Sequence, residues 1–333
     1  MMYYLGIDVS KSTLDVAAVK DGAVILEKQI QNEKSSLRLF LKELLHEFNF
    51  SNDQVVVCLE HTGIYNYRAL EVLQKAGVKV CLEPALRIKQ SQGMTRGKDD
   101  KVDARRIALY AYKNREDLAF WKPKRMVLQK LQALLSSRER LIKTKVQLEI
   151  PLQESAGYLE PSTARSLKGF SQPVIKAIKK ELVRLEKELN ALVKSDDGIK
   201  EQHRIITSVP GVGNVTALNM IIHTNEFKSI REPKKFACYA GVAPFKHESG
   251  SSIRGRNRVS KLANMTMKKL LHLGAMSAIQ CNEEIRVYYQ RKVQAGKNKM
   301  SVINAVRNKL ISRIFACVAQ GRLYQDNYKY ILA

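Results

Sequence analysis

The sequence has few of the features that mark secreted, membrane-spanning or zinc-binding proteins. Its five cysteines are scattered and show no CxxC or Cys/His spacing, so we expect buried free thiols rather than disulfides or a zinc site. The longest apolar stretches, such as 55–59 and 275–279, fall far short of the ~18–20 residues that span a bilayer. The first residues lack a basic segment followed by an apolar one. These absences favour a cytoplasmic protein that does not associate with a membrane.

Acidic side chains are also scarce. There are 32 Asp and Glu against 57 Lys and Arg, which gives a net charge of +25 and argues against an ordinary neutral metabolic enzyme. The imbalance is uneven, because residues 1–60 carry a net charge of −3 and the remainder carries +28. Between Lys228 and Arg313 there are nineteen basic and four acidic residues. Such a surface attracts phosphate backbones, because each neutralised phosphate releases counterions, so nucleic acid is the expected partner.

The first 120 residues have the pattern of an α/β domain. Apolar or alternating segments predict strands, and helical spacing predicts the segments between them. The predicted strands are 3–9, 14–19, 24–29, 54–60 and 78–82, and the predicted helices are 32–48, 64–76 and 101–113. An asparagine at position 32 is placed to cap the first helix. This order predicts a mixed sheet covered by helices, which we assign to residues 1–120.

The rest of the chain has a helical pattern. Residues 126–150 and 174–194 are heptad-like, and the breaks are expected near Pro151 and at 157–161. This predicts a helical coiled-coil arm over residues 121–200, which would also serve in dimerisation. From Arg204 onward the sequence is helical and strongly basic. We therefore expect a mainly helical C-terminal domain at residues 201–333 that meets a phosphate backbone.

Four acidic side chains of the first domain are expected to converge. Asp8 closes the first strand and Glu60 closes the fourth, so both emerge at one edge if the strands are neighbours. Asp100 and Asp103 stand three residues apart at a helix start and so share one face. Carboxylates that meet this way repel unless cations hold them, and paired Mg²⁺ ions do so in nucleases and polymerases. The pattern predicts a metal-dependent, nuclease-like centre.

A glycine-rich turn lies between two apolar segments of the last domain. It reads SVPGVG and includes Gly211 and Gly213. Backbone N–H groups in such a turn can point at a phosphate, as helix N-termini do. A tight turn between two packed helices would need the same residues, and the sequence alone does not separate these interpretations.

A second polar run, HESGSSIRGRNR at 247–258, sets hydroxyls beside three alternating arginines that could clamp phosphates. A serine there could attack a phosphodiester if its hydroxyl were activated, and nearby metal ions would serve. The residues alone do not distinguish Ser249, Ser251 and Ser252, and a solvated basic loop is the plain alternative. Tyr239, just before this run, is expected in the core.

Five segments together resemble the DEDD-type transposases of bacterial insertion sequences, a family that includes pilin-gene invertases and bridge-RNA-guided recombinases. The segments are GIDVSKSTLDV, CLEHTGIY, GKDDKVDARRIA, SVPGVG and YAGVAPFKHESGSSIRGRNRVSK. The resemblance covers the whole chain in the family's order and spacing. One departure is that the family's KTDxxDA pattern is here GKDDKVDA, with Asp99 where Thr is common. The role of Asp99 stays open.

The resemblance implies a RuvC-like, RNase H-type first domain that binds Mg²⁺, with Mn²⁺ a possible substitute, through Asp8, Glu60, Asp100 and Asp103. It singles out Ser249 as the nucleophile of the C-terminal transposase domain. It also implies that Lys246, Arg254 and Lys261 contact DNA or support such contacts. Together with Arg256, Arg258, Gly211 and Gly213 from the patterns above, they make up the expected nucleic-acid-binding residues.

The implied activity is transposition or recombination of DNA through a phosphoserine intermediate in the bacterial cytoplasm. The implied partners are double-stranded DNA at the element ends and target, a structured guide (bridge) RNA, and further copies of the chain in a homodimer or homotetramer. Ser249 would act with the carboxylates of a partner subunit.

Other functions stay open at this point. A hydrolytic nuclease or junction resolvase would use the same carboxylates without serine chemistry, and a site-specific invertase would need no RNA guide. A non-enzymatic nucleic-acid-binding scaffold would need neither the carboxylates nor the serine. The first strand also looks like the phosphate loop of actin-like and sugar-kinase ATPases, but no second half of that fold is evident.

Overall fold

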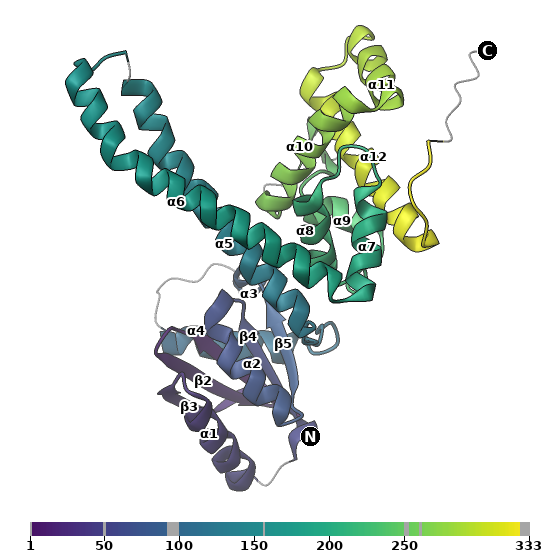
Figure 1. Ribbon diagram of the computed structural model, residues 1–333. Helices are drawn as coiled ribbons and strands as arrows, with labels where there is room; N and C mark the ends of the chain where they lie inside the picture. Colours follow the sequence, from purple (N-terminus) through teal and green to yellow (C-terminus); the bar gives the residue numbers. More distant parts are fainter. Residues whose placement is uncertain are drawn as a thin grey trace. The chain divides into compact units, whose positions relative to one another are not determined.

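The computed structural model describes residues 2–48, 51–91, 100–155, 157–249, 253–259 and 262–326, without the side chains of 100, 101, 246–249 and 253–258. The chain forms two compact units, Met1–Pro123 and Lys124–Ala333. Figure 1 follows the elements of each unit along the sequence. No helix within the described ranges is long and apolar enough to cross a membrane. The predicted division of the chain into three domains stays a prediction.

A five-stranded mixed sheet forms the centre of the first unit. Its strands are β1 (Tyr3–Val9), β2 (Thr13–Lys20), β3 (Ala23–Gln31), β4 (Val55–Glu60) and β5 (Lys79–Glu83). The strand order is β3-β2-β1-β4-β5. The first three strands form an antiparallel meander, whereas β4 and β5 run parallel to β1. The predicted α/β fold with a mixed sheet is confirmed.

Helices cover both faces of this sheet (Figure 1). They are α1 (Lys34–Glu47), α2 (Asn66–Lys75), α3 (Ala85–Gln90) and α4 (Asp100–Lys113), with short 3₁₀ turns at Asn52–Gln54 and Gly63–Tyr65. Leu5 and Ile7 point to the face covered by α1 and α2, whereas Tyr4 and Cys58 point to the face covered by α3 and α4. This alternation is the two-residue period of a strand, and it explains why the parallel strands read as continuous apolar runs.

Helix α4 lies directly on β1 because Gly6 has no side chain. A Cβ atom built on Gly6 would lie 2.2 Å from the backbone nitrogen of Ala108 and 2.3 Å from the carbonyl oxygen of Ala104. No other residue type allows this approach, since the contacts are with main-chain atoms that cannot rotate away. The glycine therefore sets the distance between the sheet and the helix that begins with Asp100.

The second unit consists of a helical arm and a helical body. Its elements are α5 (Met126–Ser155), α6 (Pro161–Lys194), α7 (Asp197–Thr207), α8 (Asn214–Thr224), α9 (Pro233–Tyr239), β6 (Pro244–Ser249), β7 (Ile253–Val259), α10 (Met265–Cys281), α11 (Glu283–Gln294) and α12 (Lys299–Gln320). The arm is α5 against α6 (Figure 1). At its base, Leu128, Leu131, Leu185 and Leu189 are buried in the same core as the body helices. The predicted mainly helical region is confirmed.

Several expectations need correction. Pro151 does not break α5, which continues to Ser155, because a proline one turn from a helix end removes a single hydrogen bond. The polar run near residue 250 is not helical, since β6 and β7 pair as an antiparallel hairpin. The cap of α1 is Glu33 rather than Asn32. Two of the five cysteines, Cys238 and Cys281, are exposed rather than buried.

Arg125 holds the base of the arm to the body. It donates hydrogen bonds of 2.8 and 3.1 Å to Asp196, the N-cap of α7, and of 2.7 and 2.9 Å to Glu226. Both bonding partners raise the pKa of Arg125. The Glu226 side chain is only 6% exposed and keeps Lys228 as a second partner at 3.2 Å. Loss of Arg125 therefore leaves a buried carboxylate only partly compensated.

We expect Arg125→Ala to lower the free energy of unfolding of the second unit by about 2 kcal/mol, because a buried carboxylate loses its main partner. Urea unfolding followed by far-UV circular dichroism measures this, since the second unit holds most of the helix. The matched control is Arg204→Ala, which removes an exposed pair with Glu201 and is expected to cost ~0.5 kcal/mol or less. Equal effects of the two substitutions would contradict this role for Arg125.

Candidate active site

Asp8 and Glu60 lie side by side at one edge of the sheet. In the parallel pairing of β1 with β4, Gly6 is opposite Cys58 and Ile7 is opposite Leu59, so Asp8 and Glu60 come next in the same register. Both are half-buried. Asp8 shares the face of Gly6, because strand side chains alternate, and that face carries α4.

The first turn of α4 brings Asp103 to this edge. The helix begins at Asp100, and Asp103 stands one turn later. Burial, followed by the negative charge of Asp103, raises the pKa of Glu60. Asp103 itself accepts a 2.8 Å hydrogen bond from Arg106. Glu60 and Asp103 thus meet closely enough to repel, while the Asp100 side chain lies outside the described residues.

Two further carboxylates, which no local sequence pattern predicts, belong to the same row. Asp15 pairs with Asp8 across β1 and β2, and Glu83 pairs with Glu60 across β4 and β5. Both are buried, at 4% and 3% exposure. Gln29 donates to Asp15 at 2.9 Å, and Arg87 donates to Glu83 at 3.2 Å. Arg87 therefore compensates the charge of Glu83, whereas Gln29 only supplies a hydrogen bond to Asp15.

Buried amides hold the loops that follow β1 and β4. Asn66 donates a 2.6 Å hydrogen bond to the carbonyl oxygen of Glu60 and accepts one of 3.2 Å from the backbone of Thr62. Asn32 donates to the carbonyl oxygens of Ser10 at 2.8 Å and Tyr65 at 3.3 Å. These bonds fix the strand ends from which Asp8 and Glu60 project, and they explain why Asn32 does not cap α1.

The donor set suits a divalent metal ion. Among the described side chains, which leave out Asp100, no three metal-binding groups cluster closely enough to hold an ion. The groups that do converge are carboxylates, whose hard oxygens prefer Mg²⁺. A cation would also relieve the repulsion between Asp103 and Glu60. The chemistry of the residues therefore fits a metal site that Asp100 would complete.

The glycine-rich turn of the body joins α7 to α8. Gly211 has a φ of +83°, and a Cβ built on it would lie 2.4 Å from the carbonyl oxygen of Gly274 in α10. Packing therefore requires glycine at this position, which favours the interhelical-turn interpretation for Gly211. Gly213 is exposed at the N-cap of α8, where a Cβ would meet nothing within 4 Å. Of the two glycines, Gly213 is the one open to a phosphate.

The β6–β7 hairpin carries the predicted serine and arginines. Ser249 is the last residue of β6 and pairs with Ile253, while Arg254 pairs with Glu248 and Arg258 with Phe245. Arg254, Arg256 and Arg258 all lie in β7, where a register shift opposite 245–247 interrupts the regular alternation of the strand. Lys246 lies in β6. The side chains of these residues, together with Ser251, Ser252 and Lys261, lie outside the description.

His223, near the end of α8, is part of a half-buried network at the base of this hairpin. Its Nδ1 lies 2.8 Å from the hydroxyl of Tyr239, which also accepts a 2.8 Å hydrogen bond from Asn264. Burial, followed by the positive charge of Lys124, lowers the pKa of His223 to about 4. Burial raises the pKa of Tyr239. Tyr239 is half-buried in a polar contact rather than a plain core residue.

The low pKa of His223 makes a prediction about acid stability. In the unfolded chain the imidazole of His223 binds a proton below its ordinary pKa of 6.5, whereas in the folded protein it stays neutral down to about pH 4. Stability is thus lost as the pH falls through this window, by up to about 3 kcal/mol. Urea unfolding at several pH values should give a shallower pH dependence for His223→Gln than for the parent chain. Parallel curves for the two proteins would contradict the assignment.

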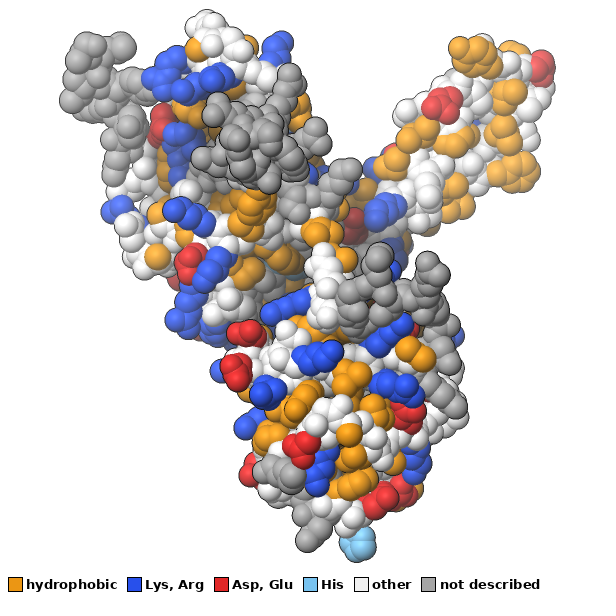
Figure 2. Space-filling model, turned by 180° about the vertical axis from the view of Figure 1, so that it is seen from behind, with side chains coloured by type: hydrophobic (Ala, Val, Ile, Leu, Met, Phe, Trp, Pro, Cys, Tyr) orange, Lys and Arg blue, Asp and Glu red, His pale blue; other side chains and the backbone are white. Residues whose placement is uncertain are grey.

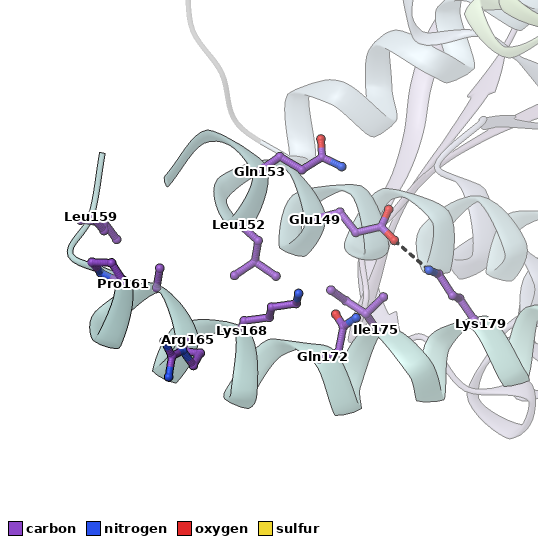
Figure 3. Close-up of a pocket in the computed structure, with 11 residues that line it drawn as sticks. Glu149, Leu152, Gln153, Leu159, Pro161, Arg165, Lys168, Gln172, Ile175 and Lys179 are labelled. Carbon is purple, nitrogen blue, oxygen red and sulfur yellow. Dashed lines mark ion pairs between the residues drawn. The ribbon is translucent and has the colours of Figure 1, made fainter. Parts of the chain in front are cut away.

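A groove of about 610 Å³ lies between α5 and α6 in the outer half of the arm. Figure 3 shows Leu152 and Ile175 facing each other across it. Lys179 forms an ion pair of 3.3 Å with Glu149 there. Nearby, Tyr158 is 92% exposed and Phe170 is 78% exposed. This groove lacks a pair of groups suited to catalysis, and its exposed apolar side chains are typical of a contact surface.

Figure 2 shows Lys and Arg side chains distributed over one face of the helical body, with fewer Asp and Glu among them. This distribution agrees with the basic composition of residues 228–313. It suits a polyanion and needs no single deep pocket.

Comparison with known proteins gives two family matches and several relatives. A model described as transposase, of the DEDD type of IS110, matches residues 5–155, and a model described as transposase of the IS116/IS110/IS902 family matches 203–290. The pilin gene-inverting proteins of Moraxella bovis and Moraxella lacunata are each 25% identical over 323 residues, 96% of both chains. The transposase for insertion sequence element IS1111A of Coxiella burnetii is 27% identical over 209 residues, 55% of both chains.

Among solved structures, two of Thermus thermophilus RuvC, one with a Holliday junction substrate, match 36% of this chain and all of theirs at 16% identity, with TM-scores of 0.29 and 0.28. The first family model spans the unit that bears the carboxylates, and the second spans the glycine-rich turn and the hairpin, in the expected order. The chain therefore belongs to the IS110/IS116 family of transposases, enzymes that cut and recombine DNA.

Proposed function

We propose that this transposase cuts and rejoins DNA through a phosphoserine intermediate, at a centre built from the carboxylates of the first unit and Ser249 of the second. The observation that carries the proposal is the register of β1 and β4, which sets Asp8 beside Glu60. Asp103 lies near enough to raise the pKa of Glu60. Carboxylates that converge in a protein of net charge +25 suit a metal-dependent reaction on phosphates.

Asp8, Glu60, Asp100 and Asp103 would hold Mg²⁺, or Mn²⁺ in its place. When bound, such ions stabilise the negative charge that develops on the attacking and leaving oxygens of a phosphoryl transfer. The chain's own contribution is to keep these carboxylates at one edge of the sheet. Gly6 does so by letting α4 approach β1, and Asn66 does so by fixing the end of β4.

Ser249 is the proposed nucleophile. The Oγ of Ser249 forms a bond to the phosphorus of a DNA phosphodiester, and the proton of the hydroxyl passes to solvent. One P–O bond of the phosphodiester breaks, and the oxygen of that bond leaves as the hydroxyl of the free strand end. The hydroxyl of a new DNA end later attacks the same phosphorus and releases the serine. No external energy source is needed, because the phosphoester bond is conserved in the covalent intermediate. The carboxylates would come from a partner subunit, as the family resemblance implies.

The helical body would bind the DNA backbone. Arg254, Arg256 and Arg258 are concentrated in β7, which suits contacts to phosphates, and Lys246 and Lys261 are close to them in the sequence. Gly213 at the start of α8 offers backbone N–H groups to a phosphate. Gly211 supports this turn through its packing on Gly274 rather than through a contact with DNA.

A structured guide RNA and further copies of the chain are the other proposed partners. The RNA would pair with donor and target DNA, so that base pairing supplies sequence recognition and the protein reads shape. This part of the proposal rests on the family resemblance. The exposed Tyr158 and Phe170 of the arm support assembly into a homodimer or homotetramer through the arms.

Site-specific inversion without a guide RNA is the second candidate. It is favoured by the pilin gene-inverting proteins, which match 96% of this chain. Recombination of DNA carrying the element ends, with and without RNA transcribed from the element's flanks, separates the two. A requirement for RNA supports guided transposition, whereas recombination without RNA supports inversion.

The serine assignment is tested by the covalent adduct. Labelled DNA carrying the element ends is incubated with Mg²⁺, RNA transcribed from the element's flanks, and the parent chain, Ser249→Ala, Ser251→Ala or Ser252→Ala. The SDS-resistant protein–DNA band is then measured for each protein. We expect the band to vanish only in Ser249→Ala. Cut DNA without any protein-linked product in the parent chain would support the hydrolytic nuclease instead.

A further inference from the structure

The β6–β7 hairpin is attached to the body at two roots. It leaves the body after α9, which ends at Tyr239, and returns at Asn264, the N-cap of α10. Contacts at these roots therefore decide how firmly the hairpin is held against the body.

The outgoing root is fixed by main-chain and amide hydrogen bonds. The backbone nitrogens of Val242 and Ala243 donate to the carbonyl oxygen of Ala237 at 2.8 and 3.1 Å. The carbonyl oxygen of Val242 in turn accepts from the side chains of Asn304 at 2.8 Å and Asn308 at 3.3 Å, both on α12. Val242 is fully buried, so this root is anchored in the core.

The returning root is tied to the outgoing one through Asn264. Its backbone nitrogen donates to the carbonyl oxygen of Tyr239 at 2.8 Å, and its side-chain nitrogen donates to the Tyr239 hydroxyl at 2.8 Å. Its side-chain oxygen accepts from the backbone of Met267 at 2.9 Å and so caps α10. One residue thus closes the hairpin and starts the next helix.

The Tyr239 hydroxyl links this closure to α8. Because the hydroxyl already accepts a hydrogen bond from Asn264, its own proton is free to be donated to Nδ1 of His223, 2.8 Å away. That requires a neutral His223 with its proton on Nε2, which agrees with the low pKa of this buried imidazole. The Tyr239 ring also packs on Phe236, with 5.9 Å between ring centroids. Helix α8, whose N-cap is Gly213, is therefore connected to both roots.

We propose that Tyr239, His223 and Asn264 form a clasp that positions the β6–β7 hairpin, and with it Ser249, for attack on a phosphate of DNA that α8 contacts. The three are positioning residues, because they act through the hairpin and not on the substrate. The inference rests on the proposed role of Ser249. It goes beyond that role because it proposes that hydrogen bonds at the base of the hairpin determine where the nucleophile lies.

The clasp is tested with Tyr239→Phe, which keeps the ring and removes the hydroxyl. Hydrogen exchange of the backbone amides of Ala243 and Asn264 in the full chain reports opening of the roots, and we expect it to become about tenfold faster, as for the loss of two hydrogen bonds. The single-turnover rate of covalent adduct formation should fall about tenfold or more, because small displacements of a nucleophile are costly. Affinity for a labelled duplex carrying the element ends should change less than about twofold, since no backbone contact is lost.

Two further comparisons keep the test specific. Tyr289→Phe makes the same chemical change at a half-buried tyrosine of α11 in the same unit and should leave both the exchange and the adduct rate unchanged. His223→Gln keeps an acceptor for the Tyr239 hydroxyl and should restore most of the adduct rate that His223→Leu loses. Equal losses in His223→Gln and His223→Leu would overturn the acceptor role of His223.

The failure of the clasp and the failure of the serine mechanism give different results. The clasp is overturned if hydrogen exchange at Ala243 and Asn264 is unchanged in Tyr239→Phe. It is also overturned if this exchange becomes faster but the rate of covalent adduct formation does not change. A covalent adduct that persists in Ser249→Ala overturns the proposed function instead. Accelerated exchange in Tyr239→Phe would in that case still support a clasp that holds the hairpin.

Discussion

Replacing Asp8 by asparagine is expected to reduce DNA strand cleavage by at least about 10³-fold while leaving the fold intact. Asp8 lies next to Glu60 in the register of two parallel strands, on the face covered by α4. Asparagine has the same size but no negative charge, so it weakens the hold on a cation without disturbing the packing. Single-turnover cleavage of DNA carrying the element ends measures the effect, and circular dichroism checks the fold.

The control for this substitution is Asp53→Asn. Asp53 is an exposed residue in the short 3₁₀ turn that precedes β4, at the opposite end of the strand from Glu60. The Asp53→Asn substitution removes the same charge from the same unit, and we expect DNA cleavage to stay within about twofold of the parent chain. Retained cleavage in Asp8→Asn, or an equal loss in Asp53→Asn, would contradict a specific role for the carboxylates at the sheet edge.

Gly6→Ala is the second substitution with a large expected effect. The added methyl group would lie 2.2 Å from the backbone nitrogen of Ala108, so α4 must move away from β1. We expect the free energy of unfolding of the first unit to fall by about 3 kcal/mol. Because Asp100 and Asp103 move with α4, cleavage should also fall about 10²-fold. Urea unfolding followed by fluorescence of Trp121, the single tryptophan, which packs on this sheet, measures the stability.

Gly169→Ala is the matched control for Gly6→Ala. A Cβ on Gly169, within α6, would meet nothing within 4 Å. The same change there should stabilise the helix by about 0.5–1 kcal/mol, because alanine loses less backbone entropy than glycine. If Gly6→Ala has the same stability and the same rate of DNA cleavage as the parent chain, α4 does not approach β1 as closely as described.

The sheet and its carboxylate edge were predictable because their signals are local. Strand periodicity and apolar runs placed Asp8 and Glu60 at strand ends, and the spacing of Asp100 and Asp103 placed them at a helix start. Only the neighbour relation of β1 and β4 had to be assumed, and the structure has them paired. Their role as metal ligands and the role of Ser249 stay predictions.

The features that sequence reasoning missed depend on contacts between distant segments. Asp15 and Glu83 join the carboxylate row only through strand register, which no local pattern reveals. The hairpin near residue 250 has a glycine-rich, polar sequence that reads equally well as a loop. Tyr239 looked like a core residue because its partners, His223 and Asn264, lie 16 and 25 positions away.

The most direct test of the central claim asks whether one reaction needs both units. SDS-resistant protein–DNA adducts are measured with Mg²⁺, DNA carrying the element ends and RNA transcribed from the element's flanks. The proteins are the parent chain, Asp8→Asn, Ser249→Ala and a mixture of the two variants. The account predicts an adduct in the parent chain, none in either variant alone, and a restored adduct in the mixture, where one subunit supplies the serine and its partner supplies the carboxylates. An adduct formed by either variant alone, or none formed by the mixture, would contradict it.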